Sequence, residues 1–278
     1  MENEKTNQTH LKKYNLSLQL YTLNQEATTS QPIVGKTVAD LDKKSVRSFL
    51  ALPLVKEHFT KNKIAAKTPL DEKLRLLTLM TNGYVIKGTF FCLAHVSNLG
   101  VFGGSMTSTA FGVFATLNKM VVRKSEHIYG NLVQQYEELY ELLVKELSPM
   151  EIIEWNPRKL DYSIPHDVFR ELLANAFIHR SYEPTALYRT MIEVYPDRLV
   201  IKNSGSFPEN MNPADPKTLN SVQRNPEIAR FFFLNGFIEM QGSGIDRVQQ
   251  ILRERGMQPA VYEMQNDLVT VTVYKKQQ

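Results

Sequence analysis

Apolar residues recur every three or four positions in several parts of the chain, and this spacing predicts amphipathic helices. The first two helices predicted in this way each have an Asp near the start, where the helix dipole favours a negative charge. In the third, the apolar stripe is complete and consists of Leu132, Tyr136, Leu139, Leu143 and Leu147. The five predicted helices are residues 40–59, 69–80, 130–147, 165–180 and 245–255.

Shorter runs alternate between apolar and polar residues or are rich in β-branched and aromatic residues, and these predict strands. Asn82-Gly83 indicates a hairpin turn within residues 81–96, and Pro196-Asp197 indicates a tight turn between two strands. Residues 266–276 predict a closing strand. The glycines of residues 98–126 are assigned to turns between strands, because no Gly-Lys-Ser/Thr follows them as it would in a P-loop.

The composition changes along the chain in a way that predicts three parts. Residues 1–40 are polar and predict a loose arm with one strand-like run, "LSLQLYTL". Residues 41–150 predict a mixed α/β domain, whose two helices and hairpin resemble a winged-helix outline or form a small α+β packing unit without DNA contact. The proline-rich stretch after residue 148 is the predicted boundary, so a second domain spans residues 151–278.

Composition and charge say more about the cellular compartment of the chain than about its biochemical function. With 278 residues, 42% of them hydrophobic, the chain can bury a core. A net charge of +4 is compatible with nucleic acid but does not require it. Cys92 is the only cysteine and has no partner for an internal disulfide, and no apolar run is long enough to span a bilayer. We therefore expect a reducing, cytoplasmic setting and no membrane partner.

The candidate chemistry begins with polar residues on the predicted helix 165–180. Phe169, Leu172, Leu173, Ala176 and Phe177 form its apolar stripe, and Glu171, Asn175 and His179 follow one another at intervals of four on the other side. Asn is a poor helix former, so its position within the helix needs a reason. Either these residues are a solvated face, or they belong to a binding site.

Two glycine motifs downstream favour a binding site. One predicted strand ends at Asn203 and Gly205, which places both residues in a loop. Gly242 and Gly244 lead directly into the last predicted helix. Glycines at a helix start let the backbone approach a phosphate, and the free N–H groups of the first turn bind that anion. A tight turn would use the same glycines.

In their order along the chain, these motifs resemble the N box and the two glycine boxes of the GHKL (Bergerat) ATP-binding fold. The motifs are "RELLANAFIHR", "NSG" and "GSGI". Histidine kinases, gyrase-type topoisomerases, MutL proteins and large heat-shock chaperones share that fold. The chain is most similar to the RecG-related or transcriptional-regulator group, in which a Schlafen/AlbA-type DNA-binding domain precedes a divergent GHKL-like domain. The resemblance covers about residues 40–275.

The resemblance implies an α+β fold, in which a two-layer α/β sandwich of GHKL type follows a smaller mixed α/β region. ATP and Mg are the implied cofactors. Asn175 would complete the Mg site with the ATP phosphates, and Glu171 would be the general base. Asn203 would meet the adenine, Gly205 would let the ligand approach, and residues 208–241 would form a mobile lid. The phosphates would be cradled by Gly242, Ser243 and Gly244.

The chain departs from the GHKL pattern in several respects. Asn203 stands where an Asp is usual, and Phe207 replaces the second glycine of the first box, where its ring would crowd a nucleotide. Helicase activity has no support because a Walker lysine is lacking, and kinase activity has none because phosphoacceptor helices are not evident. The AlbA-type domain is not found before residue 40, so we expect a shortened family member, a partial gene product, or a DNA-binding half supplied by a partner.

Two functions remain open at this level. In the first, the chain is a transcriptional regulator whose divergent GHKL-like domain binds a nucleotide with little or no hydrolysis and is a weak ATPase at most. In the second, it is a non-catalytic GHKL-like scaffold for dimerisation or DNA binding that has lost ATP. The expected partners are a nucleotide, DNA bound directly or through another protein, and a second copy of the chain.

Overall fold

A computed structural model describes most of the chain from residue 28 onward. Within those described residues no helix has the length and apolar character needed to cross a membrane. The described ranges are 28–100, 108–148, 163–183, 186, 189–207, 224–239 and 244–276. The strand-like run "LSLQLYTL" and most of the proline-rich boundary lie outside them.

Six strands form one mixed sheet in the order β4-β3-β5-β6-β8-β7. Strands β3 and β5 are parallel, and all other neighbours are antiparallel. Because β3 and β4 precede residue 150, the sheet draws on both sides of the predicted domain boundary. The strands are β3 (Ser108–Phe114), β4 (Val122–Tyr129), β5 (Met191–Val194), β6 (Arg198–Ser204), β7 (Val261–Gln265) and β8 (Leu268–Tyr274).

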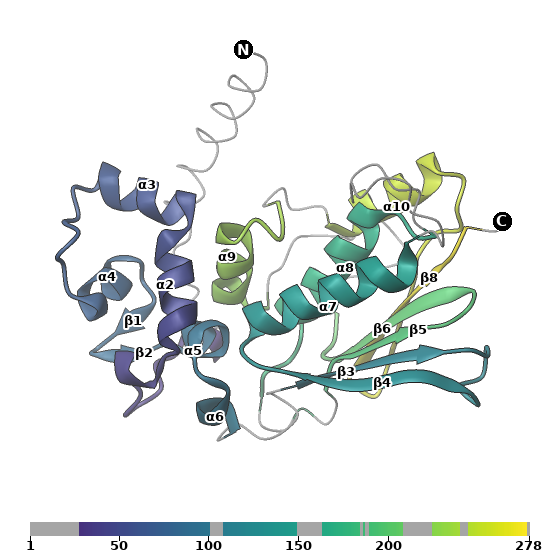
Figure 1. The fold of residues 1–278 in the computed structure, drawn as a ribbon, viewed down its shortest axis with the longest axis horizontal. Coiled ribbons are helices and arrows are strands. Elements are labelled where there is room, and N and C mark those ends of the chain that lie inside the picture. The colour runs from purple at the N-terminus through teal and green to yellow at the C-terminus, as the bar shows by residue number, and fades with distance from the viewer. Residues whose placement is uncertain are drawn as a thin grey trace, which may run out of the picture.

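Three helices cover one face of this sheet, so the fold is a two-layer α/β sandwich (Figure 1). They are α7 (Leu132–Leu147), α8 (His166–Ile178) and α10 (Gly244–Glu254). The strands turn alternate side chains toward the helices, as the buried pattern of Val269, Val271 and Val273 in β8 illustrates. A capping box of Asn131 and Gln134 begins α7, and its predicted apolar stripe is fully buried. The predicted fold class is confirmed.

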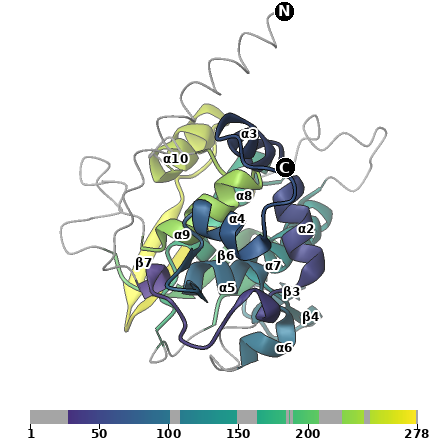
Figure 2. The ribbon, with the colours of Figure 1, turned by 90° about the vertical axis from the view of Figure 1, so that its left-hand side faces the viewer.

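A smaller mixed α/β region precedes the sheet and lies at the other end of the molecule (Figure 1), so that it is nearest to the viewer in Figure 2. Its hairpin has the predicted Asn82-Gly83 turn, in which both residues have positive φ angles. The elements are η1 (Thr28–Ser30), η2 (Val38–Asp40), α2 (Lys43–Ala51), α3 (Pro53–Lys61), α4 (Leu70–Leu76), β1 (Met80–Thr81), β2 (Tyr84–Val85), α5 (Lys87–Leu93) and α6 (Val96–Leu99).

Two sequence-based predictions for this region are wrong in detail. The single helix predicted over residues 40–59 is divided at Leu52, because Pro53 begins a new helix at a position that needs no N–H donor. The aromatic run after Gly83 continues as helix α5 instead of a hairpin strand. Residues 88–93 are all buried, and a short run that is apolar on every side has no periodicity to distinguish a helix from a strand.

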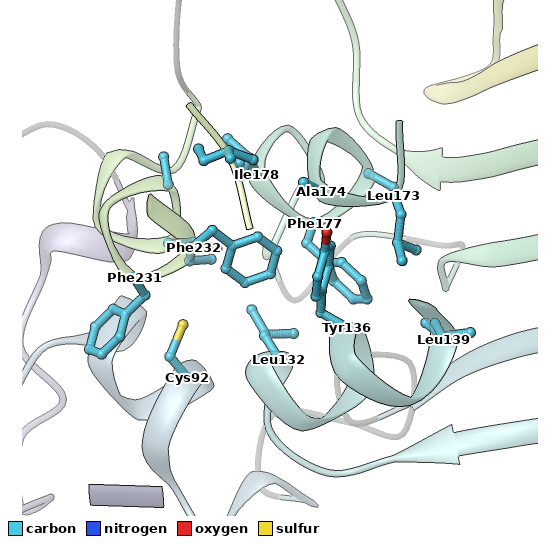
Figure 3. Packing of buried hydrophobic residues seen from close by; sticks show 14 of the residues in the cluster. Cys92, Leu132, Tyr136, Leu139, Leu173, Ala174, Phe177, Ile178, Phe231 and Phe232 are labelled. Carbon is cyan, nitrogen blue, oxygen red and sulfur yellow. The ribbon is translucent and has the colours of Figure 1, made fainter. Parts of the chain in front are cut away.

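Helix α9 (Pro226–Leu234) joins the two regions through one continuous core. The Phe231 ring lies 4.8 Å from that of Phe49 in α2, while Phe232 packs against Tyr136 of α7 and Phe177 of α8. Figure 3 shows Phe231 and Phe232 pointing into this core from one helix. The prediction that residues 208–241 form a mobile lid is wrong for residues 226–234, because these residues are a packed helix.

Candidate functional site

Helix α8 carries the first part of the candidate site and is buried on nearly every side. Its predicted apolar stripe is buried, and so are Val168, Ala174 and Ile178 on its other sides. Helices α7, α9 and α10 pack around it. Glu171 and Asn175 are half-buried as a result, so they are not part of a solvated face, whereas His179 at the end of the helix is exposed.

Glu171 and Asn175 lie one turn apart and face the first residue of α10. The Asn175 Nδ2 donates a hydrogen bond of 3.4 Å to Glu171 Oε1. A Cβ atom placed on Gly244 would lie only 2.5 Å from Glu171 Oε1 and 3.2 Å from Asn175 Nδ2. With any larger residue at position 244, the end of the Glu171 side chain would have to move away from the start of α10. The structure thus brings together three of the residues predicted for the site.

The surroundings of Glu171 favour its neutral form. Burial raises the pKa of this carboxyl, and the charges of Arg247 and Arg170 and the hydrogen bond from Asn175 oppose that shift only in part. Arg247 itself donates a hydrogen bond of 2.7 Å to Glu239. A carboxylate with a raised pKa is a stronger base than an ordinary one, so Glu171 is suited to accept a proton.

Two tyrosine hydroxyls near Glu171 are buried without a hydrogen-bond partner among the described residues. They belong to Tyr136 of α7 and Tyr262 of β7. Burial raises the pKa of both phenols, and the charge of Glu171 contributes to each shift. The Nε atom of Arg170 is likewise buried and has no partner in the described part of the chain. Unsatisfied buried polar atoms are rare in native structures. The polar atoms of this cluster around α8 can therefore form further hydrogen bonds.

The first glycine motif lies on β6, close to the end of α8. Asn203 is 5% exposed and lies on the helix-covered face, in line with Leu199 and Ile201. Its amide makes one long hydrogen bond of 3.4 Å to the Ser204 carbonyl. The side chain is therefore held by packing more than by hydrogen bonds.

Gly205 lies where two backbone segments converge. Its φ angle is +145°, and an added Cβ would lie 3.2 Å from the His179 carbonyl oxygen. The Gly205 N–H donates to the Asp267 carbonyl at 2.8 Å, and the Ser181 N–H donates to the Ser204 carbonyl at 2.7 Å. These backbone hydrogen bonds therefore join three segments near Gly205: the end of α8, the end of β6 and the β7–β8 turn.

The remaining predicted residues cannot be placed. Gly242 and Ser243 lie outside the described residues, as do residues 208–223 of the predicted lid. The second glycine motif is therefore represented by Gly244 alone. Together, the described site residues form one group at the start of α10 and another at the end of α8. His179 connects the groups, because its N–H donates to the Asn175 carbonyl at 2.9 Å and its own carbonyl lies against Gly205.

Asn225 was missed as a residue that shapes this region. Its side-chain amide is 2% exposed and donates to the carbonyls of Ile178 and Arg180, at 2.8 and 2.7 Å. These carbonyls lie at the end of α8, where helical partners are lacking. The Asn225-Pro226 pair is a helix-start signal, so the sequence contained the information needed to predict α9 at this point.

A family model matches part of the sandwich. Residues 189–273 match the model described as "Putative ATP-dependent DNA helicase recG C-terminal". This range contains β5, β6, α9, α10, β7 and all of β8 except its last residue, with both glycine motifs. The matched region is therefore similar to a RecG-related, ATPase-like domain. None of the curated proteins matches the chain.

Among solved structures, the chain is similar to the crystal structure of the DIP2311 protein from Corynebacterium diphtheriae. The two superpose with a TM-score of 0.67 at 18% sequence identity. The match covers 90% of this chain and 40% of the DIP2311 chain, so the present chain spans well under half the length of that protein. At this identity the likeness concerns the fold alone.

Proposed function

We propose that this chain binds a nucleotide, ATP with Mg, at the surface formed by α8, the start of α10 and the end of β6. The observation that carries this proposal is the direct contact of Gly244 with Glu171 and Asn175. These residues come from two motifs that are some 70 positions apart in the sequence. This close approach supports a functional reason for the pair of motifs, and the RecG-related match includes the second motif.

The start of α10 supplies the anion-binding part of the proposed site. The helix has 11 residues, and its first N–H groups have no partners within the helix. The Glu171 carboxyl lies beside this helix start, because a Cβ on Gly244 would be 2.5 Å from Glu171 Oε1. A phosphate would be favoured there by the same N–H groups and by the helix dipole.

The donors at this surface fit Mg held together with phosphates. The Asn175 amide and the Glu171 carboxylate offer oxygen atoms, which this hard cation prefers. Among the described residues no group of three or more His, Cys, Asp or Glu side chains could hold a metal ion by itself. Mg commonly uses one or two protein ligands and completes its shell with substrate phosphates and water. Asn175 would thus hold Mg only together with ATP, and the ion would neutralise phosphate charge.

Asn203 is the proposed contact to the base. Its amide can accept from the adenine amino group and donate to the neighbouring ring nitrogen, and a rotated amide offers the reverse pattern to guanine. A carboxylate at this position could only accept hydrogen bonds, so it would not offer the pattern that fits guanine. We therefore expect weaker discrimination between ATP and GTP than an Asp would give, and a titration with each nucleotide measures this preference.

Little or no hydrolysis is proposed. Glu171 would be the base that takes a proton from water, because burial raises its pKa. However, its Oε1 atom is in contact with Gly244 and Asn175, which restricts access by water. Together with the resemblance to the RecG-related group of GHKL-like transcriptional regulators, this supports binding as the primary event and regulation as its purpose.

Calorimetric titration of the purified chain with ATP and Mg, and with a non-hydrolysable analogue, tests the proposal. We expect saturable binding that Asn175→Ala abolishes, because this substitution removes the oxygen ligand proposed for Mg. Gln250→Ala, an exposed polar residue on α10, is the matched control and retains binding. Circular dichroism verifies that each variant is folded. A folded chain that releases no heat with millimolar ATP contradicts the proposal.

One observation favours the alternative of a GHKL-like scaffold without nucleotide. Phe207, in place of a glycine, packs its ring against the hydrophobic core beside the first glycine motif. If that ring closes the base site, Phe207→Gly should create nucleotide binding that the wild-type chain lacks. If the wild-type chain already binds ATP, this alternative is rejected.

A further inference from the structure

The positive charge of the chain is concentrated in its N-terminal region. Residues 28–100 carry 11 Lys and Arg against 5 Asp and Glu, a net charge of +6. Residues 101–278 carry 19 against 21, a net charge of −2. The overall charge of +4 therefore conceals a basic region attached to a slightly acidic sandwich. A segregated positive charge creates an attractive field for a polyanion.

Within this region the clearest group of cations is residues 56–68, which we name the basic segment. It consists of the second half of α3 and the connection toward α4, and it carries four exposed lysines against one acid, Glu57. Glu57 is paired with Lys61 at 2.6 Å. No ion pair within the described part of the chain involves the three others, Lys56, Lys63 and Lys67.

The backbone of the basic segment is ordered by its own hydrogen bonds. Lys63 has a φ angle of +54°, and the Ile64 N–H donates to the Phe59 carbonyl at 2.9 Å, which ends α3 with a left-handed residue. Further along, Lys73 of α4 donates to the Ala66 carbonyl at 2.6 Å. A charged segment with a fixed backbone loses less conformational entropy on binding than a loose one.

A stabilising effect on helix α3 explains only some of the lysines in the basic segment. Cations near a helix C-terminus interact favourably with the helix dipole, which accounts for Lys61 and Lys63. Lys56 lies in the first half of the helix, and Lys67 lies six residues beyond its end. The effect falls off within the last turn, so these two lysines need another reason.

Neighbouring elements extend the basic surface. Lys43, Lys44 and Arg47 are exposed on α2 and fall within a 100° arc of that helix. The hairpin β1–β2 follows α4 directly, so helices α2 to α4 and the hairpin have the order of a winged-helix unit (Figure 1). This region lies at the opposite end of the molecule from α10.

We propose that the basic segment, with Lys56, Lys63 and Lys67 as its main contacts, binds the phosphate backbone of double-stranded DNA independently of base sequence. A duplex is favoured over a single strand because single strands are held by stacking on exposed aromatic rings. The Phe and Tyr side chains of residues 28–100 are all buried or half-buried. A membrane is disfavoured, since the large exposed apolar residues here, Val34, Leu76 and Val96, belong to separate elements.

Fluorescence anisotropy with a labelled 20-base-pair DNA duplex, measured across a range of salt concentrations and without nucleotide, tests this inference. We expect the duplex to bind at low salt. The logarithm of the association constant should fall linearly with the logarithm of the salt concentration. Replacing Lys56, Lys63 and Lys67 together by Gln should weaken binding at least tenfold and reduce the slope by about three. The control replaces Arg123, Lys145 and Arg253 by Gln, which removes the same charge from exposed positions of the sandwich and should change affinity less than twofold.

Each other outcome overturns the inference. If both triple variants lose affinity equally, overall charge and not the basic segment is responsible. A wild-type chain that prefers a single strand of the same length, or binds vesicles of anionic phospholipid but not the duplex, has a different partner. Absence of duplex binding at 50 mM salt from a folded sample has the same consequence. Because nucleotide is omitted, the result does not depend on the nucleotide site.

Discussion

At the scale of single residues, position 244 shows how a glycine permits close packing of two helices. Gly244 lies beside the carboxyl of Glu171 and the amide of Asn175, so the start of α10 packs directly against these side chains of α8. The sequence motif explains this glycine by a bound phosphate. The structure adds a second reason that needs no ligand, because a Cβ at this position would displace the end of the Glu171 side chain.

We expect Gly244→Ala to lower the free energy of unfolding by about 1 kcal/mol at most, since the added methyl group must displace the end of the Glu171 side chain. In a Glu171→Ala background the same substitution should cost less by about 1 kcal/mol, because the overlap is gone. Urea unfolding of the four chains measures this coupling. Gly100→Ala is the control, since a Cβ there meets nothing within 4 Å. Equal costs in both backgrounds would contradict the contact.

The pH dependence of stability should distinguish two buried carboxyls. Burial raises the pKa of Glu171 above its ordinary 4.5, so its ionisation in the folded chain is unfavourable and stability is lost as pH rises through the shifted value. Glu171→Gln should therefore match the wild type at pH 4 and be more stable than it at pH 8. Urea unfolding at both pH values measures the difference.

Glu193 provides a control of opposite sign. Burial alone would raise its pKa, but the hydrogen bonds and charges of Lys119 and Lys202 prevail and lower it. Its contribution to stability is therefore present above pH 4.5 and is lost as pH falls through the lowered value. Glu193→Gln should be less stable than the wild type at pH 8, with a smaller difference at pH 3. The same sign for both variants would contradict the assigned environments.

At the scale of elements, periodicity predicted the helices that have one polar side and failed for those that have none. Helix α7 shows a complete stripe in the sequence, and all of that stripe is buried. Helices α5 and α9 are apolar on nearly every side because they lie between the two regions, so spacing could not reveal them. Strand β7 was also missed, although the positive φ angles of Asn266 and Asp267 form the hairpin turn that joins it to β8.

We expect Asn225→Ala to lower the free energy of unfolding by about 1–3 kcal/mol, because it leaves the buried carbonyls of Ile178 and Arg180 without donors. Asn62→Ala is the matched control. Asn62 is exposed, and its amide also donates to a helix carbonyl, that of His58, so its loss should change stability by less than about 0.5 kcal/mol. Thermal and urea unfolding measure both. Equal effects would mean that Asn225 does not fasten the end of α8.

At the scale of the whole molecule, α9 connects the candidate nucleotide site with the basic region. Asn225 at its start binds the end of α8, Glu227 accepts a hydrogen bond of 2.9 Å from Thr29, and Arg230 donates to the Leu77 carbonyl beyond α4. Sequence reasoning could not foresee these contacts, because each joins residues distant in the chain. The order of the three motifs along the chain, in contrast, was enough to predict the candidate site residues.

The predicted domain boundary near residue 150 and the pairing of the sheet lead to different expectations for fragments. Residues 151–278 lack β3, β4 and α7, which would leave the edge of β5 and the apolar surface of α8 exposed. We therefore expect residues 108–278 to give a cooperative thermal transition and residues 151–278 to give none. Circular dichroism of the two fragments measures this. A folded 151–278 fragment would support the boundary predicted from sequence instead.

Hydrogen–deuterium exchange of the full chain with and without ATP and Mg tests the central claim most directly. We expect slower exchange in residues 166–178 and at the start of α10 when the nucleotide is present, because both line the proposed site. The basic segment, residues 56–68, serves as an internal reference and should not change. Unchanged exchange in α8 and α10 at millimolar nucleotide, in a sample that is folded, would contradict a nucleotide site at this position.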